Sequence, residues 1–358
     1  MINLEERNQK IIDAVIKKAD SLCPGALALI GVYGSFARGD FHEKSDLDLL
    51  ILINDDRGWQ LGCGFIQEDL QVGHDIYCTT WEQLAADARY EHPNISKLMD
   101  AQIVYCADDS YRRQLDALRQ TAKEILSAPL SAEDCAKAEK QLKEAQHHYA
   151  ETMISECRSD VLSGAGNVIY YVENTVAMLN KQYFHRGVNR AYEELDAMQH
   201  RPEKLCATID AVISATSTAS VKEHLTTLMR ETTAVFRQVR AALLPPKKAP
   251  GTDVLAGTYE EMYSNWRNKM YTAAETGNRH LAFMSLTSLN EMFSDIGSET
   301  AIGRYDALTG YDPQDLHRTA LACDAVLREY RSEYQRAGMR ANCFSDIDTF
   351  VLDYLRQP

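Results

Sequence analysis

The stretch YGSFARGDFHEKSDLDLLILI, residues 33–53, contains the features that decide the fold of this chain. It opens with a turn at Gly34 and Ser35, and it closes with an apolar run typical of a buried strand. Asp46 and Asp48 lie two residues apart where that run begins. Because side chains two apart on a strand point to the same side, we expect both carboxylates on one face.

Two neighbouring carboxylates repel each other, so this spacing favours a bound dication between Asp46 and Asp48. Mg²⁺ suits such oxygen ligands, since it takes one or two carboxylates and completes its shell with phosphate oxygens and water. Gly34 lets a ligand approach the backbone, and the Ser35 hydroxyl and the turn's N–H groups can bind phosphate oxygens. Taken singly, each feature is also compatible with a solvated loop, and only their combination points to a site.

Further residues of the same segment and of the next predicted strand extend this candidate site. Arg38 adds a cation and Gly39 a permissive backbone. Asp75, in VGHDIYC, is the candidate for a third carboxylate, and Asp69 and Glu68 are nearby substitutes. If its strand lies beside the strand after Asp48, Asp75 reaches the same cleft. Two metals about 3.5–4 Å apart could then clamp a phosphoryl displacement.

The first 107 residues show alternating helix and strand patterns, which predict an α/β domain. A capping box at Thr80 and Gln83 predicts a helix that begins with TWEQL. The other expected elements are a helix over 5–22, strands over 26–33, 46–53, 70–78 and 101–107, and a loop over 54–64.

After about residue 108 the patterns become helical throughout. The segment PPKKAPG, residues 245–251, has the composition of a linker. The sequence therefore predicts three domains: 1–107, an all-helical 108–244, and a second helical domain over 253–358.

Composition limits the classes of partner. The chain has 38 basic and 52 acidic residues, a net charge of −14, which disfavours nucleic-acid binding. This charge serves solubility and would also suit a cationic small substrate. Nine scattered cysteines without a CxxC motif indicate reduced thiols in a cytoplasmic protein. No apolar run is long enough to span a membrane, and the N-terminus does not resemble a secretory signal.

Together these motifs resemble the signature of the nucleotidyltransferase superfamily that includes DNA polymerase beta. The matching residues are Gly34, Ser35, Gly39, Ser45, Asp46, Asp48 and, as the third acid, Asp75. The resemblance implies a small mixed sheet with helices over about the first 107 residues. The helical remainder resembles, more faintly, the substrate domain of antibiotic nucleotidyltransferases, in MLNKQYFHRGVNRAYEEL over 178–195.

The resemblance implies a reaction in which a hydroxyl of an acceptor attacks the α-phosphorus of an Mg²⁺-bound nucleoside triphosphate, usually ATP. Pyrophosphate leaves, and a nucleoside monophosphate ester remains. An aminoglycoside-like antibiotic is the expected acceptor, with antibiotic resistance as the role. In related enzymes a carboxylate serves as general base, and here the candidates are Asp75, Glu151 and Glu173. Glu173 lies in the apolar helix VIYYVENTVAML, where a carboxylate needs a reason, although pairing with a cation would explain it.

Two other hypotheses remain open. The chain could be a protein-modifying or antitoxin-type nucleotidyltransferase whose helical region binds a protein partner. It could also be a module that binds nucleotide without transferring it.

Overall fold

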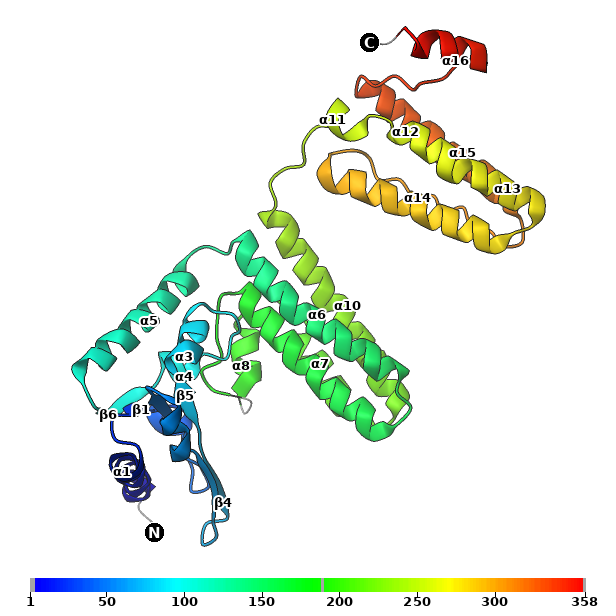
Figure 1. Ribbon diagram of the computed structural model, residues 1–358. Coiled ribbons are helices and arrows are strands. Elements are labelled where there is room, and N and C mark those ends of the chain that lie inside the picture. Colours follow the sequence, from blue (N-terminus) through cyan, green and yellow to red (C-terminus); the bar gives the residue numbers. More distant parts are fainter. Residues whose placement is uncertain (1–3, 188–189, 357–358) are drawn as a thin grey trace. The chain divides into compact units, whose positions relative to one another are not determined.

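The computed structural model describes residues 4–187 and 190–356 (Figure 1). Its contacts divide the chain into two compact units, Met1–Leu244 and Pro245–Pro358. The boundary falls where the PPKKAPG segment begins. The further division of the first unit at residue 107 stays a prediction, since one cluster of buried side chains includes residues on both sides of it.

The first unit opens with the predicted α/β part. Its helices are α1 (Leu4–Leu22), α2 (Gly34–Arg38), the short 3₁₀ helix η1 (Asp56–Leu61), α3 (Trp81–Ala88) and α4 (Ser96–Met99). Its strands are β1 (Leu27–Val32), β2 (Leu49–Ile53), β3 (Cys63–Gln67), β4 (Val72–Ile76), β5 (Cys78–Thr80) and β6 (Gln102–Cys106). The capping box at Thr80 and Gln83 is confirmed at the start of α3.

A small mixed sheet forms the centre of this part, as predicted. Its strand order is β5-β2-β1-β6, with β1 antiparallel to both neighbours and β2 parallel to β5. Along β2, Leu50 and Leu52 join one buried cluster, whereas Ile51 and Ile53 join another that contains side chains of α1. Both faces of β2 are therefore covered, which explains its unbroken apolar sequence.

The structure corrects two of the predicted strands. The strand expected over 46–53 begins only at Leu49, so Asp46 and Asp48 lie in the segment that leads into it. The strand expected over 70–78 is divided at Tyr77: β4 pairs with β3 in a separate two-stranded sheet, whereas β5 pairs with β2. Part of β3 had been expected as loop. The hairpin of β3 and β4 is therefore not a neighbour of β2.

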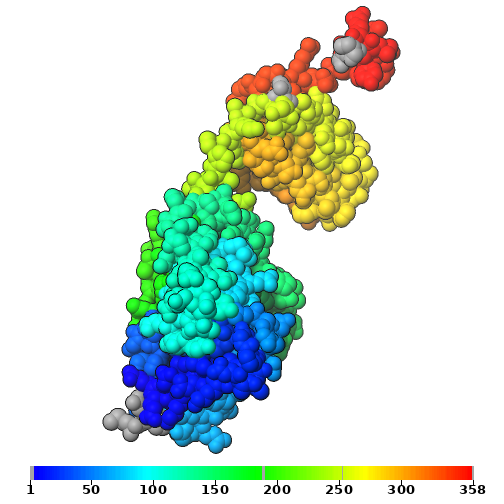
Figure 2. Space-filling model, turned by 60° about the vertical axis from the view of Figure 1, so that its left-hand side comes forward, coloured from blue at the N-terminus to red at the C-terminus, as the bar shows by residue number. Residues whose placement is uncertain are grey.

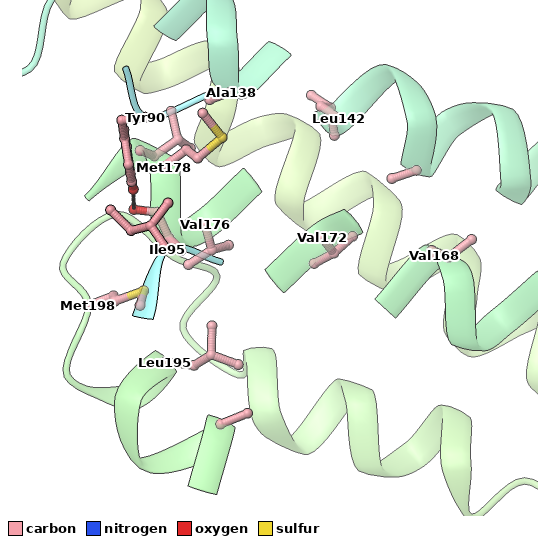
Figure 3. Packing of buried hydrophobic residues seen from close by; sticks show 14 of the residues in the cluster. Tyr90, Ile95, Ala138, Leu142, Val168, Val172, Val176, Met178, Leu195 and Met198 are labelled. Atoms are coloured by element: carbon pink, nitrogen blue, oxygen red, sulfur yellow. Dashed lines mark hydrogen bonds between the residues drawn. The ribbon is translucent and has the colours of Figure 1, made fainter. Parts of the chain in front are cut away.

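The rest of the first unit is helical. It contains α5 (Asp109–Ser127), α6 (Ala132–Ile154), α7 (Arg158–Leu179), α8 (Ala191–Asp196), α9 (Leu205–Ile213) and α10 (Thr218–Leu243). Figure 3 shows Tyr90 and Ile95 of the α/β part beside Ala138 and Met178 of α6 and α7, in one buried cluster. In Figure 2 the blue α/β part and the cyan-to-green helices form one continuous body.

The second unit is also helical and has its own buried core. Its elements are α11 (Thr252–Leu255), α12 (Thr258–Glu261), the π-helical turn η3 (Met262–Arg267), α13 (Asn268–Thr276), α14 (Arg279–Glu299), α15 (Leu316–Arg336) and α16 (Ile347–Tyr354). No residue of α16 is buried. Among the described residues, no helix has the length and apolar character needed to cross a bilayer.

Candidate active site

A pocket of about 370 Å³ lies where β1 ends and β2 begins. It is lined by most of the segment Tyr33–Asp48, by Ser96, and by residues 185–187 from the connection between α7 and α8. The predicted residues Gly34, Ser35, Arg38, Ser45, Asp46 and Asp48 are all among its lining. The structure thus places these residues of the Tyr33–Asp48 segment around one cavity. Residues 185–187 of the helical part complete its lining.

Gly34 and Asp48, which both line this pocket, are in close contact. Gly34 has a φ of +69°, and a Cβ built there would lie 1.8 Å from Oδ2 of Asp48. Only glycine leaves room for the carboxylate and adopts this backbone without strain. The backbone N–H of Tyr33 donates to the carbonyl of Asp48 at 3.1 Å, which continues the pairing of β1 and β2 into the motif.

Electrostatics at the two carboxylates favour a cation. Burial and the neighbouring Asp46 raise the pKa of Asp48 to about 6, against the opposing effect of Arg38. A dication would relieve both the burial and the repulsion. The pair therefore fits Mg²⁺, which needs only one or two protein carboxylates when a nucleotide supplies phosphate oxygens. The phosphates would lie near the Gly34–Ser35 turn.

The segment between Gly34 and Asp48 is held by local hydrogen bonds. Helix α2 begins at Gly34 and ends at Arg38, and Gly39, which has a φ of 70°, caps its C-terminus. Ser45 is buried, and its hydroxyl accepts a hydrogen bond from the N–H of His42 at 3.0 Å. Arg7 of α1 donates to the carbonyl of Ser45 at 2.9 Å. Ser45 and Arg7 therefore position the carboxylate segment.

The structure does not bring Asp75 into the pocket. Asp75 is exposed on β4, while its neighbour His74 is only 4% exposed. The ring of His74 stacks on Phe65 at 4.8 Å. Burial and Arg7 lower the pKa of His74, whereas Asp46 raises it. Alternation along the strand has placed His74, not Asp75, on the side of the motif.

The substitutes for Asp75 do not complete a metal site either. Glu68 and Asp69 are exposed in the turn that joins β3 to β4, away from the pocket lining. Across residues 4–187 and 190–356, no group of three or more His, Cys, Asp or Glu side chains is arranged to hold a metal. Within the motif, Asp46 and Asp48 are the neighbouring carboxylates of the pocket lining that could hold a cation.

The carboxylates predicted as bases in the helical part lie elsewhere. Glu173 is half-buried on α7, and burial raises its pKa to about 7, but it is not part of the pocket lining. It contributes to the raised pKa values of Tyr192 and Cys206, so it lies among α7, α8 and α9. Glu151 is exposed near the end of α6, with its carboxylate oxygens 3.5 Å from Nε2 of His147 and 3.7 Å from Nδ1 of His148.

A loop from the helical part reaches the pocket instead. Asp100, at the end of α4, accepts a hydrogen bond from the hydroxyl of Tyr183 at 2.8 Å and contacts Nδ1 of His185 at 3.2 Å. The N–H of His185 donates to Glu194 at 2.9 Å, and Arg38 donates to the carbonyl of His185. His185 lies within the stretch 178–195, but no sequence pattern singled it out.

Several other lining residues belong to no motif in the sequence. His42, Lys44 and Ser96 have no motif of their own, and Arg186 adjoins His185. A signal was available for Lys44 and His42, since both lie between the Gly-Ser turn and Asp46. No such signal existed for Ser96, which reaches the pocket only through folding.

Comparison with known proteins supports the interpretation of the motif. Residues 11–149 match the family model described as "Nucleotidyltransferase domain". A search of curated proteins found no match.

Among solved structures, a similar chain is a nucleotidyltransferase-like protein from Exiguobacterium sibiricum 255-15. It shares 10% identity over 80% of this chain and 92% of its own length, with a TM-score of 0.37, a likeness too distant to carry an argument. The family match extends past residue 107 into α6. It supports the nucleotidyltransferase superfamily for the N-terminal part of the chain.

Proposed function

We propose that the protein transfers a nucleoside monophosphate from an Mg²⁺-bound nucleoside triphosphate, with ATP as the first candidate, to a hydroxyl group of a small molecule. The observation that carries the proposal is the contact of Gly34 with Asp48, beside Asp46, in a single pocket. This arrangement joins a carboxylate pair to a turn whose backbone a phosphate can approach. The match of residues 11–149 to the nucleotidyltransferase domain supports the same reaction.

Each lining group has a role in this proposal. Asp46 and Asp48 would hold Mg²⁺, which supplies charge neutralisation for the phosphates and polarises the reacting oxygens. Ser35 and the Gly34 backbone would hydrogen-bond phosphate oxygens, and Arg38 and Lys44 would balance their charge. In phosphoryl transfer, positioning and charge stabilisation of this kind provide most of the catalysis.

For the acceptor, the proposal retains an aminoglycoside-like polyol, which the net charge of −14 would attract. A protein acceptor is the second candidate, and it has an observation of its own. Helix α16 exposes Ile347, Val351 and Leu352, and the following Leu355 is exposed as well; these apolar side chains lie outside the family match. Exposed apolar surface of this kind is often a protein-binding surface.

The test is pyrophosphate release with Mg²⁺ and each nucleoside triphosphate, with aminoglycosides, other polyols or bacterial protein as acceptor. The control is the double variant Asp46→Asn/Asp48→Asn, which keeps the shape but removes the charges. We expect release that requires an acceptor, stops in the double variant, and leaves one nucleoside monophosphate on the acceptor by mass spectrometry.

Two other outcomes would redirect the proposal. Mass added to a protein would select the second acceptor. A rise in melting temperature with Mg-ATP, without release on any acceptor, would favour a module that binds nucleotide but does not transfer it. If Mg-ATP caused no pyrophosphate release and no shift in melting temperature, that result would contradict the nucleotide site.

A further inference from the structure

We propose that His185 accepts the proton of the attacking hydroxyl, and that Asp100 is the residue that positions it. The inference rests on the nucleotidyl transfer proposed above and adds the base that this transfer requires. The carboxylates expected in that role, Asp75, Glu151 and Glu173, do not line the pocket, whereas His185 does.

The contact between His185 and Asp100 determines which ring nitrogen is available. A carboxylate only accepts hydrogen bonds, so Nδ1 of His185, at 3.2 Å from Oδ2 of Asp100, carries a proton. The lone pair of the neutral ring is then on Nε2. Tyr183 donates to the other oxygen of Asp100 at 2.8 Å, and its ring centroid lies 3.9 Å from that of His185. The carboxylate and the ring are thereby held together.

The backbone of His185 is fixed from two elements. Arg38 of α2 donates to its carbonyl, and Glu194 of α8 accepts from its N–H at 2.9 Å. Glu194 also accepts from the N–H of Arg186 at 3.3 Å. The loop is therefore hydrogen-bonded both to the Gly34–Asp48 segment and to the helical part. A base that acts between nucleotide and acceptor needs such a fixed position.

Other groups of the pocket lining are already engaged. Asp46 and Asp48 are the ligands expected for the cation. Asp40 forms an ion pair with Arg190 at 2.8 Å. Nδ1 of His42 accepts a hydrogen bond from the N–H of Lys44 at 3.1 Å, so a neutral His42 carries its proton on Nε2. Among the described His, Asp and Glu side chains of the lining, this leaves Nε2 of His185 as an uncommitted acceptor.

The proton transfer balances without an additional reactant. As the acceptor oxygen forms its bond to the α-phosphorus, its proton moves to Nε2 of His185. The bond from the α-phosphorus to the bridging oxygen breaks, and pyrophosphate leaves with the electron pair. The imidazolium then returns its proton to solvent.

Charged groups around the ring predict how the rate depends on pH. The hydrogen bond to Asp100 raises the pKa of His185, Glu194 raises it further, and burial and Arg38 lower it. The net shift is upward, so transfer should increase as the pH rises through that value and the ring loses its proton. Replacing Asp100 removes the main cause of the shift, so the inflection should move to lower pH.

The experiment compares His185→Gln and Asp100→Asn with the wild type in the pyrophosphate-release assay across pH. Exposed His147→Gln on α6 is the control and should leave the rate unchanged. We expect His185→Gln to lower kcat at least about a hundredfold and to abolish the inflection, because general base catalysis contributes about that much. Asp100→Asn should lower kcat and shift the inflection downward. Both variants should keep the rise in melting temperature with Mg-ATP.

A readout that structural damage cannot imitate is rescue of His185→Gly by imidazole added in solution, which we expect to restore part of the rate. The inference is overturned if the wild type transfers nucleotide and His185→Gln keeps its rate and pH profile. If the wild type releases no pyrophosphate with any acceptor, the proposed transfer itself is contradicted, and the role of His185 is contradicted with it.

Discussion

The Gly34–Asp48 segment and the β3–β4 hairpin were both expected to supply carboxylates to one site, but only the first does so. The segment joins two paired strands, so both of its ends are fixed by the sheet, and the carboxylate of Asp48 contacts Gly34. The hairpin pairs only with itself, and alternation along β4 turns Asp75 outward and His74 inward. A position shift of one residue reverses the side of a strand on which a group lies. A motif within one continuous turn is therefore a more secure prediction than a residue assigned across an unknown strand order.

The largest expected difference between these two regions is catalytic. Asp48→Asn should lower transfer at least about a hundredfold, because it removes a group that stabilises the charge of the transition state. Asp75→Asn should change the activation free energy by less than about 0.5 kcal/mol, as expected for an exposed residue away from the site. Pyrophosphate release by both purified variants measures the difference. If both variants lost the same share of activity, Asp75 would also belong to the active site, and the contrast between the two regions would be wrong.

A second contrast lies within the motif. Gly34→Ala would place a methyl group against the carboxylate of Asp48, whereas the surroundings of Gly39 are open and only its φ of 70° is unfavourable. Gly34→Ala should lower transfer about a hundredfold by displacing that carboxylate. Gly39→Ala should cost about 1–2 kcal/mol of stability from backbone strain and retain most activity. Transfer rates and urea unfolding of the Gly34→Ala and Gly39→Ala variants separate the effect on catalysis from the effect on stability. A fully active Gly34→Ala variant would show that the contact does not matter.

The smallest effect is on stability in the absence of metal. Because the folded-state pKa of Asp48 is raised to about 6 from 3.8, its ionisation disfavours the fold above that pH. Asp48→Asn should therefore stabilise the metal-free protein at pH 8 by about 1 kcal/mol, after allowance for solvent screening. The gain should shrink as the pH falls from about 6 to 3.8, where the wild-type carboxyl is protonated.

Denaturant unfolding in a chelator at several pH values measures this effect, with Asp75→Asn as the control. A loss of stability in Asp48→Asn at pH 8 would mean that the carboxylate is stabilised by contacts other than a metal. A gain of stability would show that the charge of Asp48 destabilises the metal-free fold, so that a bound cation is needed to offset it.

The sequence predicted most of the α/β part because its signals are local. The apolar run of β2, the capping box at Thr80 and the turn at Gly34 each depend on neighbouring residues. The division of residues 70–78 between two sheets is different, since it depends on which strand pairs with which. His185 and Ser96 show the same limit, because they reach the pocket through tertiary contacts that no periodicity encodes.

In the proposed function, Asp46, Asp48 and the Gly34–Ser35 turn hold a metal-bound nucleoside triphosphate. The most direct test is a crystal structure with Mn²⁺ and an ATP analogue that cannot be cleaved between its α- and β-phosphates, with the metal located by anomalous scattering. We expect an anomalous peak coordinated by both carboxylates, with the phosphates against the turn. A metal and nucleotide bound elsewhere, with Asp46 and Asp48 free, would contradict it.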